Sequence, residues 1–383
     1  MPFDAAGRQE KRARVAVAVS GGVDSLCALL LLRRAGYDVL ALHGLFLPEQ
    51  SASRPDGAAD PLPGLEAACR TLDIPMHTVD LRAVFQREVI DPFARAYAEG
   101  RTPNPCALCN RAVKFGALLD AALALGADKL ATGHYARLLP PCRRDADALP
   151  VLAAARDSVK DQSYFLSLVP AARLQRALFP LADQDKAQSV ALVAGAGLRV
   201  PLPRESQDIC FVPDDEVAYR PFLAAQWRAQ GMEPPGAGPV LLAERPEDGA
   251  GETREIGRHQ GLWRYTEGQR KGLGIAHSEA LYVLRKDRVA NALIVGPRSL
   301  LGMAACVTGP ANILVPPEDW PEQVWARLRH RQRAAPARAR LDARDRLHIT
   351  LAAPQFPSAP GQVAALYDAD GRVLAGGVVE RLE

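Results

Sequence analysis

The chain has 383 residues, which is too long for one ordinary domain and predicts two or three. With 48% hydrophobic and 24% charged residues, it has the composition of a folded globular protein rather than a disordered chain or a small disulfide-stabilised one. The 47 basic and 44 acidic residues give a net charge of +3, so the total charge excludes no class of partner.

The sequence contains no segment of the kind that spans a membrane, which needs about 18 uncharged apolar residues. Its most apolar stretch, Leu26–Leu32, is followed by Arg33 and Arg34. The amino terminus, MPFDAAGRQEKRAR, lacks the apolar core of a secretory signal, so we expect a cytoplasmic protein. In that reducing compartment, an odd number of cysteines, seven, indicates thiol chemistry or metal binding before structural disulfides.

Strand and helix patterns alternate over the first third of the chain. The predicted strands are Val15–Val19, Val39–Leu42, Pro75–Val79 and Lys129–Thr132, and the predicted helices are Leu26–Ala35, Glu66–Leu72 and Val113–Leu125. This alternation predicts an α/β fold with a doubly wound parallel sheet.

The texture changes near residue 205, where glycine, proline and short apolar runs begin to dominate. After Ala292, short alternating stretches separated by proline and glycine predict a small β-barrel or sandwich. The alternating stretches are Val324–Leu328, Leu347–Leu351, Val363–Tyr367 and Val373–Val379. We therefore expect a catalytic α/β domain over residues 1–205, a small central domain over 206–290 and an all-β domain over 291–383.

The segment Ser20–Ser25, SGGVDS, lies between the first predicted strand and helix. Its two glycines allow a tight turn, and amides at a helix amino end favour an anion. The G-x-x-x-x-G-K-[ST] and G-x-G-x-x-G patterns are both missing, which argues against the common ATPase loop and against a dehydrogenase. The simpler interpretation is a tight turn followed by a helix capped by Asp or Ser.

Two cysteines at C-x-x-C spacing, Cys106 and Cys109, lie in the segment Thr102–Asn110, TPNPCALCN. A thiol at a helix amino end, with Arg111 and Lys114 nearby, has a lowered pKa and higher reactivity. Half of a zinc site is the alternative, but a second C-x-x-C or a histidine pair is missing. A third cysteine, Cys210, lies in Glu205–Val212 and, taken alone, is most simply a small buried hydrophobe.

An arginine-rich segment runs from Arg327 to Arg346. Its first four arginines alternate at the strand period and predict one basic face: Arg327, Arg329, Arg331 and Arg333. Such a face suits RNA phosphates, and the alternative is an edge strand whose charges discourage aggregation.

The string SGGVDS resembles the signature of the PP-loop ATP pyrophosphatases, which bind the pyrophosphate of ATP while the α-phosphorus is attacked. Five motifs in order resemble the tRNA-specific 2-thiouridylase (MnmA) family over residue 14 to the end. The motifs are TPNPCALCN, Thr132–Ala136, Lys160–Leu166, SQDICF and Tyr265–Gly274.

This resemblance implies a PP-loop domain, a small central domain and a C-terminal β-barrel. It also implies that ATP adenylates the C2 oxygen of the wobble uridine of tRNA, and that a persulfide sulfur then replaces AMP. Cys210 would carry the persulfide received from a donor protein, and Cys109 would release the sulfur or close a disulfide with Cys210. We expect a monomer that binds tRNA, ATP and Mg²⁺, with Asp24 helping to hold the metal.

The resemblance also assigns binding residues. The expected ATP contacts are Ala18, Val19, Ser20, Gly21, Gly22, Val23, Asp24, Ser25, Gly44 and Gly133. The expected target-base and tRNA contacts are Asn104, Pro105, Cys106, His134, Lys160, Asp161, Gln162, Arg329, His330 and Gln362.

Two positions depart from the family pattern. Cys106 stands where some members have an aspartate proposed as general acid or base, so that role has no obvious occupant. Gly44 stands at the offset of a methionine that often contacts adenine. The first departure leaves an iron–sulfur cluster held by Cys106, Cys109 and Cys210 as an alternative. A tRNA-binding protein that keeps a nucleotide pocket without catalysis is a separate alternative, which the intact loop and thiols disfavour.

Overall fold

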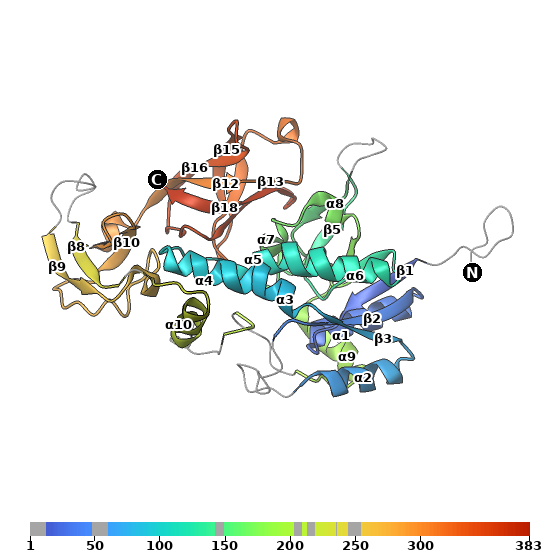
Figure 1. The fold of residues 1–383 in the computed structure, drawn as a ribbon. Coiled ribbons are helices and arrows are strands. Elements are labelled where there is room, and N and C mark those ends of the chain that lie inside the picture. Colours follow the sequence, from blue (N-terminus) through green and yellow to red (C-terminus); the bar gives the residue numbers. More distant parts are fainter. Residues whose placement is uncertain are drawn as a thin grey trace. The chain divides into compact units, whose positions relative to one another are not determined.

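The computed structural model describes residues 13–47, 60–141, 149–202, 209–212, 219–234, 236–243 and 254–383. The chain forms two compact units (Figure 1), and the second contains an excursion from the first half of the sequence. The first unit comprises Met1–Glu88 and Leu108–Asp214, and the second comprises Val89–Ala107 and Asp215–Glu383. The boundaries expected near residues 205 and 290 stay predictions, and residues 203–208 lie outside the described part.

The first unit is built on a parallel sheet with the strand order β3-β2-β1-β4-β7. Its strands are β1 (Arg14–Ala18), β2 (Asp38–Leu45), β3 (Met76–Asp80), β4 (Lys129–Ala131) and β7 (Ala177–Leu178). The chain builds β1, β2 and β3 outward in one direction and then returns to place β4 on the other side of β1. The predicted doubly wound parallel sheet is confirmed.

The central strand β1 is buried on both faces, whereas the edge strand β3 is largely exposed. Val15 and Val17 of β1 pack into a core with Leu26 and Leu29 of the following helix, while the alternate residue Ala16 is equally inaccessible on the opposite face. The helices and short strands of this unit are α1 (Val23–Arg34), α2 (Leu62–Thr71), α3 (Arg82–Phe85), η2 (Cys109–Leu118), α6 (Leu119–Ala124), β5 (Arg137–Leu139), β6 (Val151–Ala153), α7 (Ser163–Leu166), α8 (Ala171–Leu174) and α9 (Lys186–Gly195).

The helix expected over Val113–Leu125 starts earlier than its apolar pattern indicates. It begins with α5 (Pro105–Leu108), continues through the π-helical η2 and ends with α6. Gly116 interrupts it with φ −100° and ψ −107°. A second π-helical stretch, η1 (Gln86–Ile90), precedes α4 (Asp91–Ala98). Such local widening of a helix is common at functional sites.

The second unit contains two sheets. The smaller has the order β10-β11-β8-β9, and the larger closes on itself because β12 pairs with both β16 and β18. The C-terminal sheet is therefore a closed barrel, as the family resemblance implied. The elements are α10 (Tyr219–Ala229), β8 (Gly238–Leu242), β9 (Arg254–His259), η3 (Leu262–Arg264), β10 (Tyr282–Asp287), β11 (Ala292–Gly296), η4 (Arg298–Leu300), β12 (Met303–Pro310), β13 (Asn312–Ile313), η5 (Pro317–Asp319), β14 (Val324–Arg327), β15 (Ala335–Leu341), β16 (Arg346–Gln355), β17 (Val363–Tyr367) and β18 (Val373–Leu382).

The prediction that four arginines alternate along one strand is wrong. Strand β14 ends at Arg327, and the chain then turns, with Arg331 at φ 64°. The edge-strand alternative is wrong too, because β14 pairs with β15 on one side and β17 on the other. The short polar turn after Arg327 breaks the strand, and arginine spacing alone gave no sign of it.

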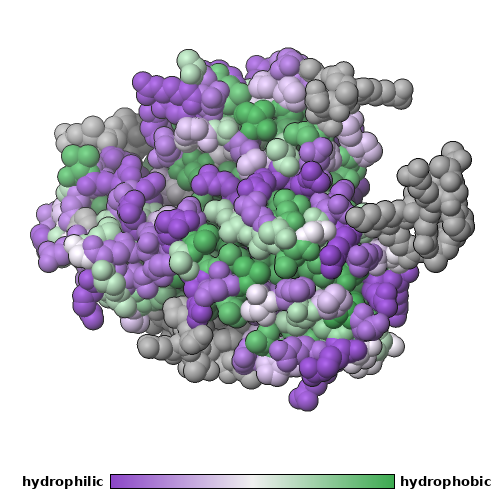
Figure 2. Space-filling model, turned by 45° about the vertical axis from the view of Figure 1, so that its right-hand side comes forward, coloured by the Kyte–Doolittle hydropathy of each residue, from purple (hydrophilic) through white to green (hydrophobic). Residues whose placement is uncertain are grey.

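Hydrophilic side chains cover much of the face drawn in Figure 2, with apolar patches between them. Within the ranges described above, no helix is long and apolar enough to cross a membrane.

Closure of the barrel depends on a glycine. A Cβ at Gly377 of β18 would come within 2.6 Å of Thr308 Oγ1 and 2.8 Å of Thr308 Cβ on β12. We expect Gly377→Ala to destabilise the barrel by about 1–3 kcal/mol and to lower its calorimetric unfolding midpoint by several degrees. Gly257→Ala on β9 is the control, because its Cβ would meet only Ile275 Cγ1 at 3.7 Å. Equal midpoints for the two variants would contradict this account of barrel closure.

Candidate functional site

The predicted nucleotide loop lies at the carboxyl edge of the parallel sheet, between β1 and α1. Gly44 lies near the carboxyl end of β2, and Gly133 follows β4 by two residues. Because the strand order reverses between β1 and β4, these segments meet at the position where open parallel sheets bind ligands.

The loop itself is fixed by its own hydroxyl and backbone groups. Gly21 has φ 92°, a conformation that glycine adopts without strain. Ser25 Oγ accepts from the Ser20 amide at 3.2 Å and donates to the Gly22 carbonyl at 2.9 Å. Gly22 is the N-cap of α1, and no side chain caps that end. The first amides of α1 therefore keep their capacity to bind an anion.

The Asp24 carboxylate is held by Tyr135, from the motif Thr132–Ala136, and by Lys186, which belongs to none of the motifs. Lys186 Nζ lies 2.7 and 2.8 Å from its two oxygens, and Tyr135 Oη donates to it at 2.9 Å. Lys186 begins α9, where Asp185 and Gln188 form a capping box. That D-x-x-Q pattern was a readable helix-start signal that would have drawn attention to Lys186.

The backbone at Gly133 lies directly against the first turn of α1. A Cβ there would come within 2.7 Å of Asp24 C and 2.8 Å of Ser25 N. A Cβ at Gly44 would come closest to the Phe46 ring, at 2.6 Å, and that side chain can move aside. The resemblance assigned both glycines to ATP, and the backbone contact gives a physical reason for glycine at position 133.

A methyl group at Gly133 should therefore disturb the nucleotide loop. We expect Gly133→Ala to weaken ATP binding at least about tenfold, because backbone atoms must shift to accept the Cβ. Calorimetric titration with ATP would measure this loss. Gly195→Ala in α9, where a Cβ meets nothing within 4 Å, should bind ATP as the unaltered protein does. Normal affinity in Gly133→Ala would refute the role given to this contact.

The helix that carries the C-x-x-C pair starts at its proline. Asn104 Oδ1 accepts from the Ala107 amide at 3.2 Å and so caps the helix, while Pro105 is its first residue. Cys106 is half-buried in the first turn. Cys109 is buried one turn further on, so the position expected for the pair at the helix amino end holds for Cys106 and not for Cys109.

Cys210 lies exposed in a short turn of the first unit, with the Val212 amide donating to the Ile209 carbonyl at 3.1 Å. The interpretation of Cys210 as a small buried hydrophobe is therefore wrong. Its neighbour Phe211 is buried edge-on against Phe85, with ring centroids 5.6 Å apart. This aromatic contact anchors the turn and leaves the thiol on the surface.

Two segments assigned to tRNA are joined to each other in the first unit. Gln162 Oε1 accepts from the Tyr135 amide at 3.1 Å, and the Gln162 amide donates to the Tyr135 carbonyl at 2.8 Å. Asp161 is buried and accepts from the Ala155 amide and the Ser163 hydroxyl. Lys160 is half-buried in the same turn.

His134 and Asn110 are also buried near this junction. Burial lowers the pKa of His134 well below its usual value, so the ring is neutral, and Nδ1 lies 2.7 Å from Thr132 Oγ1. Asn110, next to Cys109, donates from Nδ2 to the Phe165 carbonyl at 3.0 Å. This bond links the helix that carries Cys109 to the segment Lys160–Leu166.

The remaining expected tRNA contacts lie in the second unit. Arg329 Nη2 donates to the Glu267 carbonyl at 2.6 Å, and its guanidinium lies 5.1 Å from the centroid of the Phe356 ring. His330 is exposed beside it. Gln362 Nε2 donates to the Thr102 carbonyl at 2.9 Å, so this side chain binds the chain that leads into the C-x-x-C helix.

The donor groups give no sign of a metal centre. In the part of the chain that the structure describes, no three His, Cys, Asp or Glu side chains converge as a metal site. Cys106, Cys109 and Cys210 all belong to that part, so the iron–sulfur alternative is not supported. The zinc alternative, which needed further ligands near the C-x-x-C pair, gains no support either.

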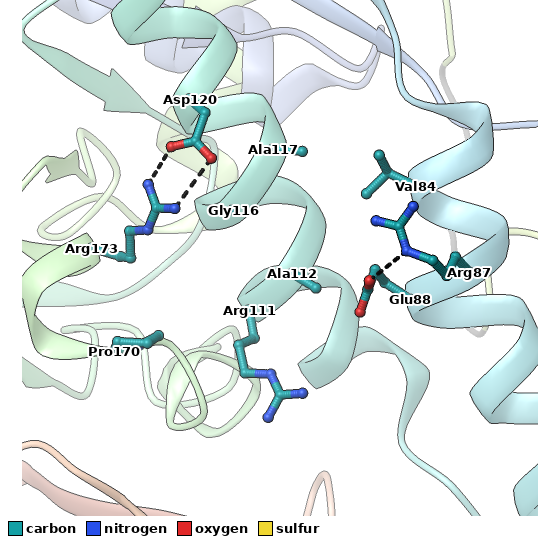
Figure 3. Close-up of a pocket in the computed structure, with 10 residues that line it drawn as sticks. All are labelled: Val84, Arg87, Glu88, Arg111, Ala112, Gly116, Ala117, Asp120, Pro170 and Arg173. Atoms are coloured by element: carbon teal, nitrogen blue, oxygen red, sulfur yellow. Dashed lines mark hydrogen bonds and ion pairs between the residues drawn. The ribbon is translucent and has the colours of Figure 1, made fainter.

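The first unit also contains a groove of about 390 Å³ beside the helix that carries Cys109 (Figure 3). Arg87 pairs with Glu88, and Arg173 forms a bidentate pair with Asp120. Arg111 projects from η2 beside the groove, and its guanidinium makes no ion pair or hydrogen bond with any described residue. The arrangement leaves one uncompensated cation two residues after Cys109.

Three family models match consecutive parts of the chain. They are described as tRNA methyl transferase HUP domain over residues 13–214, tRNA methyl transferase PRC-barrel domain over 248–297 and aminomethyltransferase beta-barrel domain over 305–379. The first covers the loop Ser20–Ser25 and the three cysteines Cys106, Cys109 and Cys210.

Curated relatives match almost the whole chain. A protein of Nitratidesulfovibrio vulgaris named tRNA-specific 2-thiouridylase MnmA is 49% identical over 96% of this chain and 99% of its own length. Proteins of the same name from Oleidesulfovibrio alaskensis and Lawsonia intracellularis are 49% and 43% identical, each over 95% of this chain and 98% of their own.

Proposed function

Because the chain belongs to the tRNA-specific 2-thiouridylase family, we propose that it converts the wobble uridine of tRNA, position 34, into 2-thiouridine, using ATP and a persulfide. The observation that carries the proposal is the nucleotide loop. The loop leads into the uncapped amino end of α1, against which Gly133 packs. The buried thiol of Cys109 and the exposed thiol of Cys210 belong to the same unit.

The first step activates the base. The C2 carbonyl of uridine resembles that of a urea and is a poor electrophile, so its oxygen must first become a leaving group. The oxygen attacks the α-phosphorus of ATP, a P–O bond breaks and pyrophosphate departs. The loop Ser20–Ser25 would bind that pyrophosphate through amides and hydroxyls, which stabilises the negative charge that it gains.

The second step transfers sulfur. A persulfide on Cys210 supplies the terminal sulfur, which attacks C2 and expels AMP. Attack of the Cys109 thiolate on the Cys210 sulfur then breaks the S–S bond, frees 2-thiouridine and leaves a Cys109–Cys210 disulfide. The two electrons that reopen the disulfide come from a thiol reductant. Exposure of Cys210 supports loading by a separate donor protein.

Magnesium fits this site poorly in the observed conformation. Both oxygens of the Asp24 carboxylate are bound by Lys186, and Tyr135 donates to one of them. A Mg²⁺ ion prefers carboxylate and phosphate oxygens, but here the ammonium group already occupies that position. We therefore derive no step through a metal held by Asp24 and propose that Lys186 keeps the carboxylate oriented.

Two of the matching families are named for methyl transfer to tRNA, which is a different reaction. Methyl transfer needs a bound methyl donor but neither a pyrophosphate loop nor a pair of separated thiols. The loop and the thiols therefore favour thiolation. Binding of tRNA without catalysis, the other alternative, would require neither the loop nor the thiols.

The deciding experiment incubates the protein with tRNA, ATP, Mg²⁺ and a persulfide donor and then analyses wobble uridine by mass spectrometry. We expect sulfur to replace oxygen at C2. An added methyl group, or unmodified uridine with tRNA still bound, would contradict the proposal.

The role of Cys210 makes a separate prediction. Cys210→Ser should abolish thiolation and leave ATP-dependent adenylation of tRNA detectable, because only the sulfur step uses this thiol. Release of pyrophosphate and formation of 2-thiouridine would be measured in parallel. Cys69→Ala is the control, because Cys69 is buried in α2 and takes no part in the proposed steps. Equal loss of both steps in Cys210→Ser would remove its sulfur-carrying role.

The arginine segment supports binding of tRNA through phosphates. Arg331 and Arg333 are exposed in the turn after β14. Replacing both by Ala should weaken tRNA binding and reduce the slope of log affinity against log salt by about one to two. Filter binding at several salt concentrations measures this slope. Arg33→Ala/Arg34→Ala, which removes the same charge from the exposed end of α1, should not change it. Matching slopes would make the segment an ordinary charged surface.

A further inference from the structure

Residue Thr102, at the start of the segment TPNPC, is held through almost all of its polar groups by distant parts of the second unit. Its amide donates to the Pro360 carbonyl at 2.8 Å, and its carbonyl accepts from Gln362 Nε2 at 2.9 Å. Its hydroxyl lies 3.2 Å from the Thr266 hydroxyl and 3.4 Å from Lys286 Nζ. We call these four partners, together with Glu267, which pairs with Lys286, the Thr102 clamp: Thr266, Glu267, Lys286, Pro360 and Gln362.

The charged part of the clamp is fully buried. Lys286 Nζ lies 3.5 Å from Glu267 Oε2, and the two side chains are 1% and 3% exposed. Burial raises the pKa of Glu267 and lowers that of Lys286, which means that the surroundings disfavour both charges. A buried ion pair of this kind contributes little net stability, but removing one partner is strongly destabilising because it leaves an uncompensated buried charge. Lys286 also donates to the Tyr265 carbonyl at 2.9 Å.

The part of the clamp at Gln362 is held in place by the barrel backbone. Gln362 is fixed by its own backbone, because its amide donates to the Ala359 carbonyl and its carbonyl accepts from the Val379 amide. The neighbouring Gly361 has φ 99°, and a Cβ there would come within 2.9 Å of the Thr102 carbonyl group. The barrel backbone thus lies directly against the chain at Thr102.

The segment between Thr102 and Cys106 is rigid, so a restraint at Thr102 also acts on the residues that follow. Pro103 and Pro105 fix two φ angles between Thr102 and the helix, and Asn104 caps that helix. Gln362 Nε2 also reaches the Pro103 carbonyl at 3.3 Å. Few torsions remain between Thr102 and Cys106, so a displacement of Thr102 must move the segment Asn104–Cys106 with it.

We propose that the Thr102 clamp holds the segment Asn104–Cys106 in the position that the reaction requires. The residues of the clamp thus act as positioning residues. The catalytic consequence rests on the proposed function, because only there does this segment face the target base. The restraint itself does not. A misplacement of about 1 Å in such a segment lowers a reaction rate by up to about a hundredfold.

The test uses full-length protein and removes the hydroxyl contacts alone. Thr102→Val keeps the shape of the side chain but loses both contacts, whereas Thr102→Ser keeps the hydroxyl. Lys286→Met removes the ammonium group, and its effect is interpreted only if the variant folds. Thr308→Val is the matched control, because Thr308 is a buried threonine of the barrel whose hydroxyl bonds Gly309 and Leu347 instead.

Four quantities are measured on each variant: the single-turnover rate of 2-thiouridine formation, the hydrogen exchange rate of a peptide covering residues 99–110, the KM for ATP and the Kd for tRNA. We expect Thr102→Val to slow thiolation about tenfold and to speed exchange by a similar factor, with the KM for ATP and the Kd for tRNA changed little. Thr102→Ser should restore both, and Thr308→Val should change neither.

Each outcome decides the proposal. Unchanged exchange in Thr102→Val overturns it, whatever the rate does, because the segment would then not depend on the clamp. Faster exchange with an unchanged thiolation rate overturns the catalytic role. If the unaltered protein makes no 2-thiouridine but exchange responds as expected, the restraint stands and the proposed function fails.

Discussion

Gly133 packs directly against the first turn of α1, and the proposed nucleotide site is built around this contact. It brings the segment after β4 against Asp24 and Ser25, at the point where the order of the parallel strands reverses. Any larger residue would push two backbones apart. This contact places the segment at Gly133 beside the uncapped end of α1 and the hydroxyl of Ser25.

Sequence reasoning worked best where a local pattern controls local structure. The β-branched run at Val15–Val19, the glycine turn and the following apolar helix gave the first strand, loop and helix to within a few residues, because burial on both faces leaves a continuous apolar signal. The resemblance between ordered motifs supplied the barrel and the family. Closure of the barrel depends on the long-range pairing of β12 with β18, which no local pattern encodes.

The failures also have physical causes. Arginine alternation predicted a strand beyond Arg327, yet the chain turns there, and side-chain spacing carries no information about a turn. Cys210 looked like a buried residue between Ile209 and Phe211, but Phe211 alone is buried. Partners such as Lys186 for Asp24, 162 positions away, could not be found without the fold.

The excursion Val89–Ala107 has a practical consequence for dissecting this chain. Helix α4 packs with α10: the Trp227 indole donates to the Ala94 carbonyl at 2.7 Å, and Phe93 lies against Phe222. A fragment cut near residue 205 would retain α4 but lose both aromatic neighbours, baring side chains that are now inaccessible to water. Such a truncated ATP-binding half should aggregate when expressed alone.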